Sequence, residues 1–213
     1  MSPAAVSRAE VSGAPFRALH VCTGNVCRSP MAEALMRSGL RSRLGEGARR
    51  FVVESAGTWG HSGSPMDPNA LSALGALGLD GLGPDGQVFR ARELVAEHVA
   101  AADLVLCATR AHRAEVVVLQ PDAAARTFTV RELGRLCAAV DPAALPSGDP
   151  VVRARALVAQ VTALREAAPP VSLRDDDLAD PYHAPRTDFA ACAVLVRAAL
   201  AGPLDLVAGA VRA

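Results

Sequence analysis

Short apolar runs, each typical of a buried strand, alternate along the chain with segments in which apolar residues recur at helical spacing. The four predicted strands are residues 16–21, 51–53, 103–108 and 127–130. Apolar residues in the third run are continuous, as expected when helices cover both faces of a parallel strand. Strands that alternate with helices favour right-handed crossovers. The pattern predicts an α/β fold, a three-layer α/β/α sandwich with a four-stranded parallel sheet.

Capping residues and prolines mark the starts of the predicted helices. Ser29 precedes Pro30 and Asp67 precedes Pro68, so each pair offers a capping side chain and then a residue that suits the first helical position. We expect the first helix to end near Gly45 or Gly47. Further helices are predicted at residues 110–119, 131–140, 151–167 and from about 186.

One domain is predicted, residues 15–213, after a flexible tail at residues 1–14. A hydrophobic share of 51% in 213 residues is enough for a single core. An extra helical segment at about residues 137–172 includes an amphipathic helix that should pack by one face. Charged residues and a proline interrupt the apolar stretch 190–213, so we expect no membrane span.

The charged residues balance, with 22 Lys+Arg against 22 Asp+Glu, and every basic residue is arginine. We therefore expect no nucleic-acid partner, because the chain has no overall basic field. The absence of lysine excludes a phosphate-binding lysine of the Walker type and a Schiff-base lysine. Five cysteines without an export signal indicate reduced thiols and a cytoplasmic protein. The sequence leaves the oligomeric state open.

The residues most suited to chemistry lie between the first predicted strand and the first helix. Residues 22–30 read Cys-Thr-Gly-Asn-Val-Cys-Arg-Ser-Pro. In so tight a loop backbone N–H groups can converge on an oxyanion, and the start of the helix adds its positive dipole end. Arg28 would close the ring with paired hydrogen bonds to phosphate oxygens, and Cys22 should be a thiolate nucleophile at neutral pH. The predicted phosphate-binding residues are Thr23, Gly24, Asn25, Val26, Cys27, Arg28 and Ser29.

Residues 21–33, VCTGNVCRSPMAE, resemble the phosphate-binding loop of the low-molecular-weight protein tyrosine phosphatase family. Further motifs resemble, in the family's order, its second loop and following helix, its central strand and its general-acid loop. These motifs are residues 55–58, 63–70, 103–107 and 180–182. Together they extend over most of the chain, and their shared order is more specific than any single motif.

The resemblance implies hydrolysis of phosphotyrosine in a protein or peptide through a phosphocysteine intermediate, with no metal or cofactor. Cys22 would attack phosphorus while Arg28 and the loop amides stabilise charge. Asp180 would protonate the leaving phenolate and then serve as base toward water. By the same resemblance, Asn25 holds the shape of the loop and Ser29 donates a hydrogen bond to the sulfur.

Aromatic side chains of the second loop and the acid loop sandwich the phosphotyrosine ring in this family. Here Trp59 and Tyr182 are the candidate substrate-lining residues, with ordinary packing as the alternative. His183 follows Tyr182 where some relatives carry another aromatic residue, which leaves the exact substrate open. His61 could also line the rim, although a single histidine in a loop is more often just exposed.

The remaining cysteines and acids have plainer interpretations. Cys27 could form a reversible disulfide with Cys22 that protects the nucleophile, or it could simply be a small packed residue. Asp175, Asp176 and Asp177 indicate a solvated loop rather than a metal site, because no histidine cluster accompanies them. The other three cysteines should belong to the core; these are Cys107, Cys137 and Cys192.

Two other functions remain open at this point. An arsenate reductase of the same fold would also begin with attack by Cys22, but it would need two further cysteines close together. Cys107 and Cys137 are thirty positions apart. A noncatalytic phospho-ligand-binding module should lack the nucleophile or the acid, and this chain has both.

Overall fold

The computed structural model describes residues 13–59, 61–79, 88–168 and 171–209. Most of the predicted tail, residues 1–12, therefore lies outside the described residues. The strands are β1 (Phe16–Cys22), β2 (Phe51–Gly57), β3 (Leu104–Cys107) and β4 (Thr127–Thr129). The α-helices are α1 (Arg28–Leu44), α2 (Pro68–Gly75), α3 (Ala96–Ala101), α4 (Arg110–Leu119), α5 (Val130–Cys137), α6 (Pro150–Ala167), α7 (Leu173–Asp176) and α8 (Arg186–Ala208). The 3₁₀ helices are η2 (Gly45–Arg50), η4 (Pro121–Arg126) and η5 (Pro142–Ala144).

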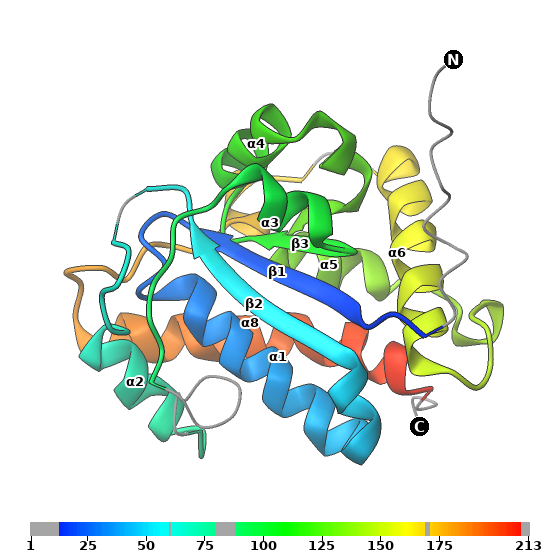
Figure 1. Cartoon of the computed structure of the whole chain (residues 1–213), viewed down its shortest axis with the longest axis horizontal. Helices are drawn as coiled ribbons and strands as arrows, with labels where there is room; N and C mark the ends of the chain where they lie inside the picture. Colours follow the sequence, from blue (N-terminus) through cyan, green and yellow to red (C-terminus); the bar gives the residue numbers. More distant parts are fainter. Residues whose placement is uncertain (1–12, 60, 80–87, 169–170, 210–213) are drawn as a thin grey trace.

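The strands form one parallel sheet in the order β2-β1-β3-β4. In the register, Ala18 of β1 lies between Val53 of β2 and Leu104 of β3. Helices α1 and α8 cover one face, and α3 and α4 cover the other (Figure 1). The predicted three-layer α/β/α sandwich with four parallel strands is confirmed. Because all strands run the same way, the segments that follow them meet at one edge of the sheet.

Alternate residues of β1 enter two different cores. Ala18 and Cys22 belong to the larger core, which α1, α5, α6 and α8 cover. Leu19 and Val21 belong to the smaller core, where Val116 of α4 packs against the sheet. This period of two is what a strand covered on both faces requires.

The long helix α8 is the central helix of the larger core. Its length and composition would suffice to cross a membrane, but 44% of its most apolar window is buried inside the protein. Helix α5 approaches it closely, since a Cβ atom on Gly134 would lie 2.6 Å from the carbonyl oxygen of Ala199. Four residues further on, Pro203 lacks the N–H that would normally bond to that oxygen. Glycine and proline together allow the two helices to cross at close range.

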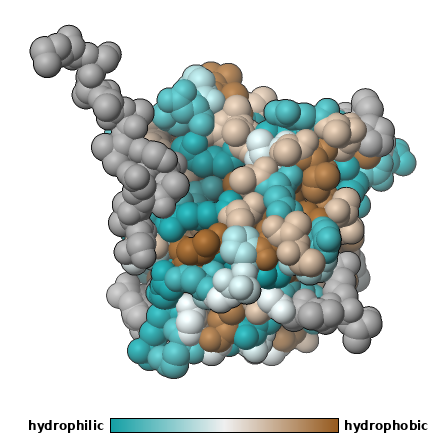
Figure 2. Space-filling view, turned by 90° about the vertical axis from the view of Figure 1, so that its right-hand side faces the viewer, coloured by the Kyte–Doolittle hydropathy of each residue, from teal (hydrophilic) through white to brown (hydrophobic). Residues whose placement is uncertain are grey.

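The predicted extra segment carries η5 and α6. Val151, Leu157 and Val161 of α6 are buried in the larger core, which agrees with a helix that packs by one face. The molecular face that carries α6 mixes hydrophilic and hydrophobic residues (Figure 2).

Two helix starts differ instructively. Asp67 caps α2 as predicted, because its side chain accepts a hydrogen bond from the Asn69 N–H at 2.7 Å. The prediction that Ser29 caps α1 is wrong. The helix begins at Arg28, and Ser29 lies in its first turn with the hydroxyl directed at the sulfur of Cys22. The fourth strand stops at Thr129 rather than residue 130, because Thr129 caps α5.

Candidate active site

Cys22 is the last residue of β1 and is buried. Its sulfur lies 3.0 Å from the Ser29 hydroxyl oxygen, which belongs to the first turn of α1. Strand end and helix start thus bring the sulfur and the hydroxyl together. This is the contact that the resemblance implies for a nucleophilic cysteine.

Residues after β2 fix the backbone of the loop that follows Cys22. The carbonyl oxygens of Cys22 and Thr23 accept hydrogen bonds from the N–H groups of Thr58 and Trp59, at 2.9 and 3.0 Å. At Gly57 a Cβ atom would lie only 2.5 Å from the carbonyl oxygen of Thr23. The two segments can approach so closely only because residue 57 has no side chain.

Asn25 holds the middle of the loop. Its backbone φ of 55° lies in the left-handed region, which asparagine tolerates better than most residues. The side-chain amide donates to the hydroxyls of Ser29 and Ser55, at 2.9 and 2.8 Å, and its carbonyl oxygen accepts from the Arg92 N–H at 2.9 Å. Ser55 in turn donates to Glu33 at 2.6 Å. Burial raises the pKa of the Glu33 carboxyl above its ordinary value.

Arg28 joins the loop to the candidate acid. Its Nη2 donates to Thr23 Oγ1 at 3.2 Å and to Asp180 Oδ2 at 2.5 Å, and Nη1 donates to the Leu178 carbonyl at 3.4 Å. The Nε atom is buried and has no hydrogen-bond partner among the described residues. Such a donor suits an oxyanion, because an unsatisfied buried N–H is unfavourable. The structure therefore brings Cys22, Arg28 and Asp180 into one site.

His112 is a neighbour of this site that the sequence analysis missed. Its Nε2 lies 2.9 Å from Thr23 Oγ1, and its Nδ1 lies 2.7 Å from Thr109 Oγ1. Burial, and then the charge of Arg28, lowers the pKa of His112 from its ordinary value, so the ring is neutral at neutral pH. A threonine two residues after β3, followed three residues later by a histidine, was the available sequence signal.

Four rings form a row at the mouth of the site. Trp59 and His61 have centroids 6.1 Å apart, His61 and Tyr182 5.9 Å apart, and Tyr182 and His183 4.0 Å apart. His61 also covers the loop, since a Cβ atom on Gly24 would meet its ring at 2.5 Å. The structure thus places Trp59 and Tyr182 in one row, with His61 between them rather than freely exposed.

The cysteines fall into two groups. Cys107, Cys137 and Cys192 are buried, as predicted for core residues. Cys22 and Cys27 are reduced and buried in the loop. Burial, and then the negative charge of Asp67, raises the pKa of the Cys27 thiol well above its usual range.

The prediction of a solvated loop at Asp175, Asp176 and Asp177 is wrong for its middle member. Asp176 is buried and pairs with Arg135. The absence of a histidine cluster argued for a solvated loop over a metal site, but it could not show that arginines from distant segments compensate the charge of a buried carboxylate here. Within the described residues, no cluster of three or more His, Cys, Asp or Glu side chains could hold a metal ion.

A reduced cysteine at the base of an anion-binding loop, next to an arginine that an aspartate approaches, defines a class of phosphatases that form a covalent bond between cysteine and phosphorus. The sequence profile described as "Low molecular weight phosphotyrosine protein phosphatase" matches residues 17–168. The chain belongs to this family, and it is an enzyme.

Individual relatives agree with the family. The chain is 35% identical to low molecular weight protein-tyrosine phosphatase A of Mycobacterium tuberculosis over 196 residues, which cover 91% of this chain and 92% of the relative. It is 34% identical over 118 residues to a protein-arginine-phosphatase of Geobacillus stearothermophilus, covering 55% of this chain and 71% of the relative. A solved structure of the arginine phosphatase YwlE from that organism has a TM-score of 0.59 at 27% identity and covers 91% of each chain.

Proposed function

We propose that the chain hydrolyses phosphotyrosine in cytoplasmic proteins through a phosphocysteine intermediate. The observation that carries this proposal is the hydrogen bond of 2.5 Å between Arg28 and Asp180, above the sulfur-bearing loop. This hydrogen bond places an anion-binding group, Arg28, and the candidate acid, Asp180, beside the candidate nucleophile, Cys22. A phosphomonoester with a poor leaving group needs all three.

In the first step the Cys22 thiolate attacks phosphorus, and the bond between phosphorus and the phenolic oxygen breaks. Asp180 donates its proton to the leaving phenolate, so tyrosine departs neutral. Arg28 and the N–H groups of residues 23–28 stabilise the charge on the equatorial oxygens. The Ser29 hydroxyl, 3.0 Å from the sulfur, stabilises the thiolate.

In the second step water attacks the phosphocysteine. Asp180, now ionised, accepts a proton from that water, the bond between phosphorus and sulfur breaks, and inorganic phosphate leaves. The carboxyl and the thiolate return to their starting states, so the cycle needs no metal and no other co-reactant. The fixed charge of Arg28 serves both steps.

Two observations support phosphotyrosine rather than phosphoarginine as the substrate: the aromatic rings at the mouth of the site and the similarity to relatives. Trp59 and Tyr182 are exposed rings beside the loop, suited to a flat aromatic group. Over the same share of this chain, 91%, the tyrosine phosphatase of Mycobacterium tuberculosis is 35% identical, whereas the arginine phosphatase of known structure is 27% identical.

The experiment compares phosphate release from matched peptides carrying phosphotyrosine, phosphoarginine or phosphoserine. We expect the wild type to prefer phosphotyrosine. Cys22→Ser should abolish turnover, and Asp180→Asn should lower it by about 10²–10⁴-fold for phosphotyrosine. Undiminished turnover in Cys22→Ser contradicts the covalent mechanism. A preference for phosphoarginine contradicts the substrate while leaving the mechanism in place.

We also propose that Cys27 protects the nucleophile. Peroxide would oxidise Cys22 to a sulfenic acid, and the Cys27 thiolate would attack that sulfur, expelling hydroxide and forming a disulfide. Because burial raises the pKa of Cys27, the disulfide should form slowly at neutral pH and faster at higher pH. Dithiothreitol should restore peroxide-treated wild type but not Cys27→Ala. Equal loss and equal rescue in both proteins rejects this role.

A further inference from the structure

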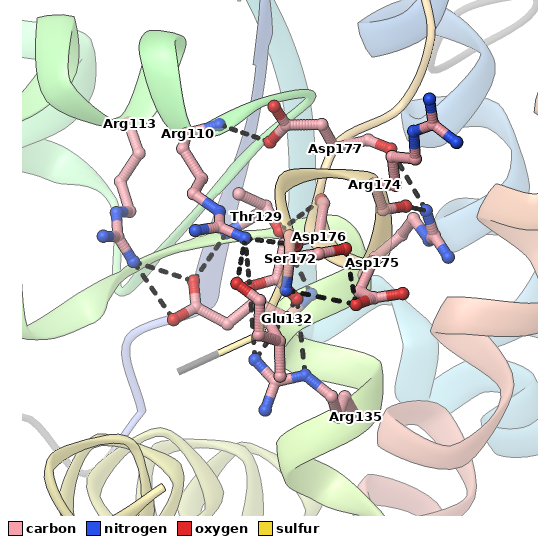
Figure 3. Close-up of polar contacts among 12 residues, drawn as sticks. Arg110, Arg113, Thr129, Glu132, Arg135, Ser172, Arg174, Asp175, Asp176 and Asp177 are labelled. Atoms are coloured by element: carbon pink, nitrogen blue, oxygen red, sulfur yellow. Dashed lines mark hydrogen bonds and ion pairs between the residues drawn. The ribbon is translucent and has the colours of Figure 1, made fainter. Parts of the chain in front are cut away.

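Arginines from two helices hold the acidic segment that precedes Asp180 (Figure 3). Arg110 is the first residue of α4, and Arg131 and Arg135 lie on α5; we call these three residues the arginine anchor. They donate hydrogen bonds to carbonyl oxygens and carboxylates of residues 171–177. Since α4 and α5 begin beyond the ends of β3 and β4, the anchor stands at the same edge of the sheet as the phosphate-binding loop.

Asp176 is the buried centre of these contacts. Its side chain is only 7% exposed, and Arg135 Nη2 lies 3.2 Å from each of its carboxylate oxygens. Arg110 lies 3.8 Å away. The Asp176 carbonyl accepts a hydrogen bond from Thr129 Oγ1 at 2.7 Å. A carboxylate this deeply buried is stable only beside its partners, so it fixes the place of the whole segment.

From Asp176 the chain leads directly into the active site. The carboxylate of Asp177 accepts a hydrogen bond from the backbone N–H of Arg110 at 2.8 Å. Leu178 is buried, and its carbonyl oxygen accepts from Arg28 Nη1 at 3.4 Å. Three consecutive residues are thus tied down just before the segment that carries Asp180.

We propose that the arginine anchor, acting through Asp176, positions Asp180 for proton transfer to the leaving group. The proposal rests on the proposed function, in which Asp180 is the general acid. Asp176 contacts neither Cys22 nor Arg28 and is a positioning residue. When the anchor is lost, Asp180 spends less time in the donating position. The loss is greatest for poor leaving groups, because activated ones depart without a proton.

The test measures kcat/KM for phenyl phosphate, a poor leaving group, and for p-nitrophenyl phosphate, an activated one. We expect Asp176→Asn to lower kcat/KM for phenyl phosphate about tenfold more than for p-nitrophenyl phosphate, a part of the roughly 10²–10⁴-fold contribution of a general acid. Arg135→Gln, from the more exposed side of the pair, should cause the same selective loss. Arg135→Lys should restore part of it because it keeps the charge.

Asp103→Asn is the matched control. Asp103 is also a largely buried carboxylate, 15% exposed, which pairs with Arg155 at 3.4 Å and accepts a hydrogen bond from the Arg17 N–H at 2.8 Å. It precedes β3, whereas the phosphate-binding loop follows β1, so it lies at the opposite edge of the parallel sheet. We expect this variant to lose stability while its ratio of the two kcat/KM values stays at the wild-type level.

The Asp180→Asn variant distinguishes the positioning role of the arginine anchor from the acid role of Asp180. The double variant Asp176→Asn/Asp180→Asn should show no selective loss beyond that of Asp180→Asn, because both changes act on one proton transfer. An unchanged ratio in both Asp176→Asn and Arg135→Gln, beside a changed ratio in Asp180→Asn, overturns the anchor and leaves the acid assignment standing. An unchanged ratio in Asp180→Asn overturns the acid assignment, and the anchor with it.

Discussion

At the scale of single residues, Asn25 shows how one side chain maintains a reactive loop. Its amide spans from Ser29 on α1 to Ser55 on β2, while its backbone takes a left-handed conformation. A replacement must therefore both make these side-chain hydrogen bonds and tolerate a left-handed backbone conformation. Two variants separate the hydrogen bonds from the conformation.

We expect Asn25→Ala to lower the free energy of unfolding by about 2–4 kcal/mol, because it loses three hydrogen bonds and strains a left-handed position. Asn25→Gly loses the same bonds without that strain, so its loss should be milder by about 1 kcal/mol. Urea unfolding measures both values. If alanine and glycine are equal, the backbone conformation contributes nothing to the effect.

His20 makes the stability of the protein depend on pH. It is fully buried in β1 beside Met36, and burial lowers its pKa to about 3. In the unfolded chain His20 binds a proton near pH 6.5, whereas in the folded protein its ring stays neutral at that pH. The contribution of His20 to the free energy of unfolding is therefore fully present above pH 6.5. It declines as the pH falls from 6.5 toward 3, by about 1.4 kcal/mol for each pH unit.

Replacing His20 should remove this dependence. His20→Leu is expected to flatten the plot of unfolding free energy against pH between 4 and 6.5. Met36→Leu, which changes the neighbour but keeps the titrating ring, should retain the slope. If the unfolding free energy of His20→Leu still falls with pH between 6.5 and 4, groups other than His20 cause the loss of stability in acid.

At the scale of elements, the crossing of α5 and α8 depends on the absence of a side chain at Gly134. We expect Gly134→Ala to lower the free energy of unfolding by about 1–3 kcal/mol, since its Cβ would meet the Ala199 carbonyl oxygen at 2.6 Å. Gly75→Ala is the control, because nothing lies within 4 Å of the added atom at that helical position. It should stabilise the protein by about 0.5–1 kcal/mol. Thermal unfolding measures both variants. If Gly134→Ala and Gly75→Ala shift the thermal midpoint equally, the close crossing of α5 and α8 is contradicted.

Elements whose signals are local could be predicted from the sequence. The apolar run of β3, the Asp67-Pro68 start of α2 and the whole of α4 follow from hydrophobic runs and capping chemistry alone. The start of α1 could not be predicted, because the hydroxyl of Ser29 serves the sulfur of Cys22 instead of the helix.

Site residues with distant partners were also beyond sequence reasoning. Asp176 pairs with an arginine 41 positions away, and His112 reaches a threonine 89 positions away. Cys22 and Arg28 were predicted from the chemistry of their own loop, but Asp180 was found because its motif resembles that of a known family. Neither composition nor spacing brings them together without the fold.

At the scale of the whole molecule, one buried arginine that joins several elements lies at the end of the sheet opposite to the active site. In Figure 1 the arrowheads of β1 and β2 point away from α6 and from the end of α8. At that far end the buried side chain of Arg153 donates hydrogen bonds to the carbonyls of Leu206, Pro142 and Pro146. It joins α6 to the last turn of α8 and to the segment that carries η5.

We expect Arg153→Ala to lower the free energy of unfolding by about 2–3 kcal/mol, because charged hydrogen bonds to buried carbonyls are lost. The kcat/KM for p-nitrophenyl phosphate should stay at the wild-type value below the unfolding transition. Arg155→Ala, on a more exposed position of the same helix, should lose no more than about 1 kcal/mol. A fall in kcat/KM for Arg153→Ala in the folded protein contradicts the separation.

The bond between Arg28 and Asp180 also has a consequence for the order of events. Nη2 of Arg28 carries two N–H groups, and Thr23 and Asp180 occupy them. A phosphoryl oxygen that binds this nitrogen must therefore take the place of the Asp180 carboxylate, one anion exchanging for another. Arrival of the substrate then frees the Asp180 carboxylate from its cation, and the freed carboxylate takes up a proton from the phosphate monoanion or from water before it serves as the acid.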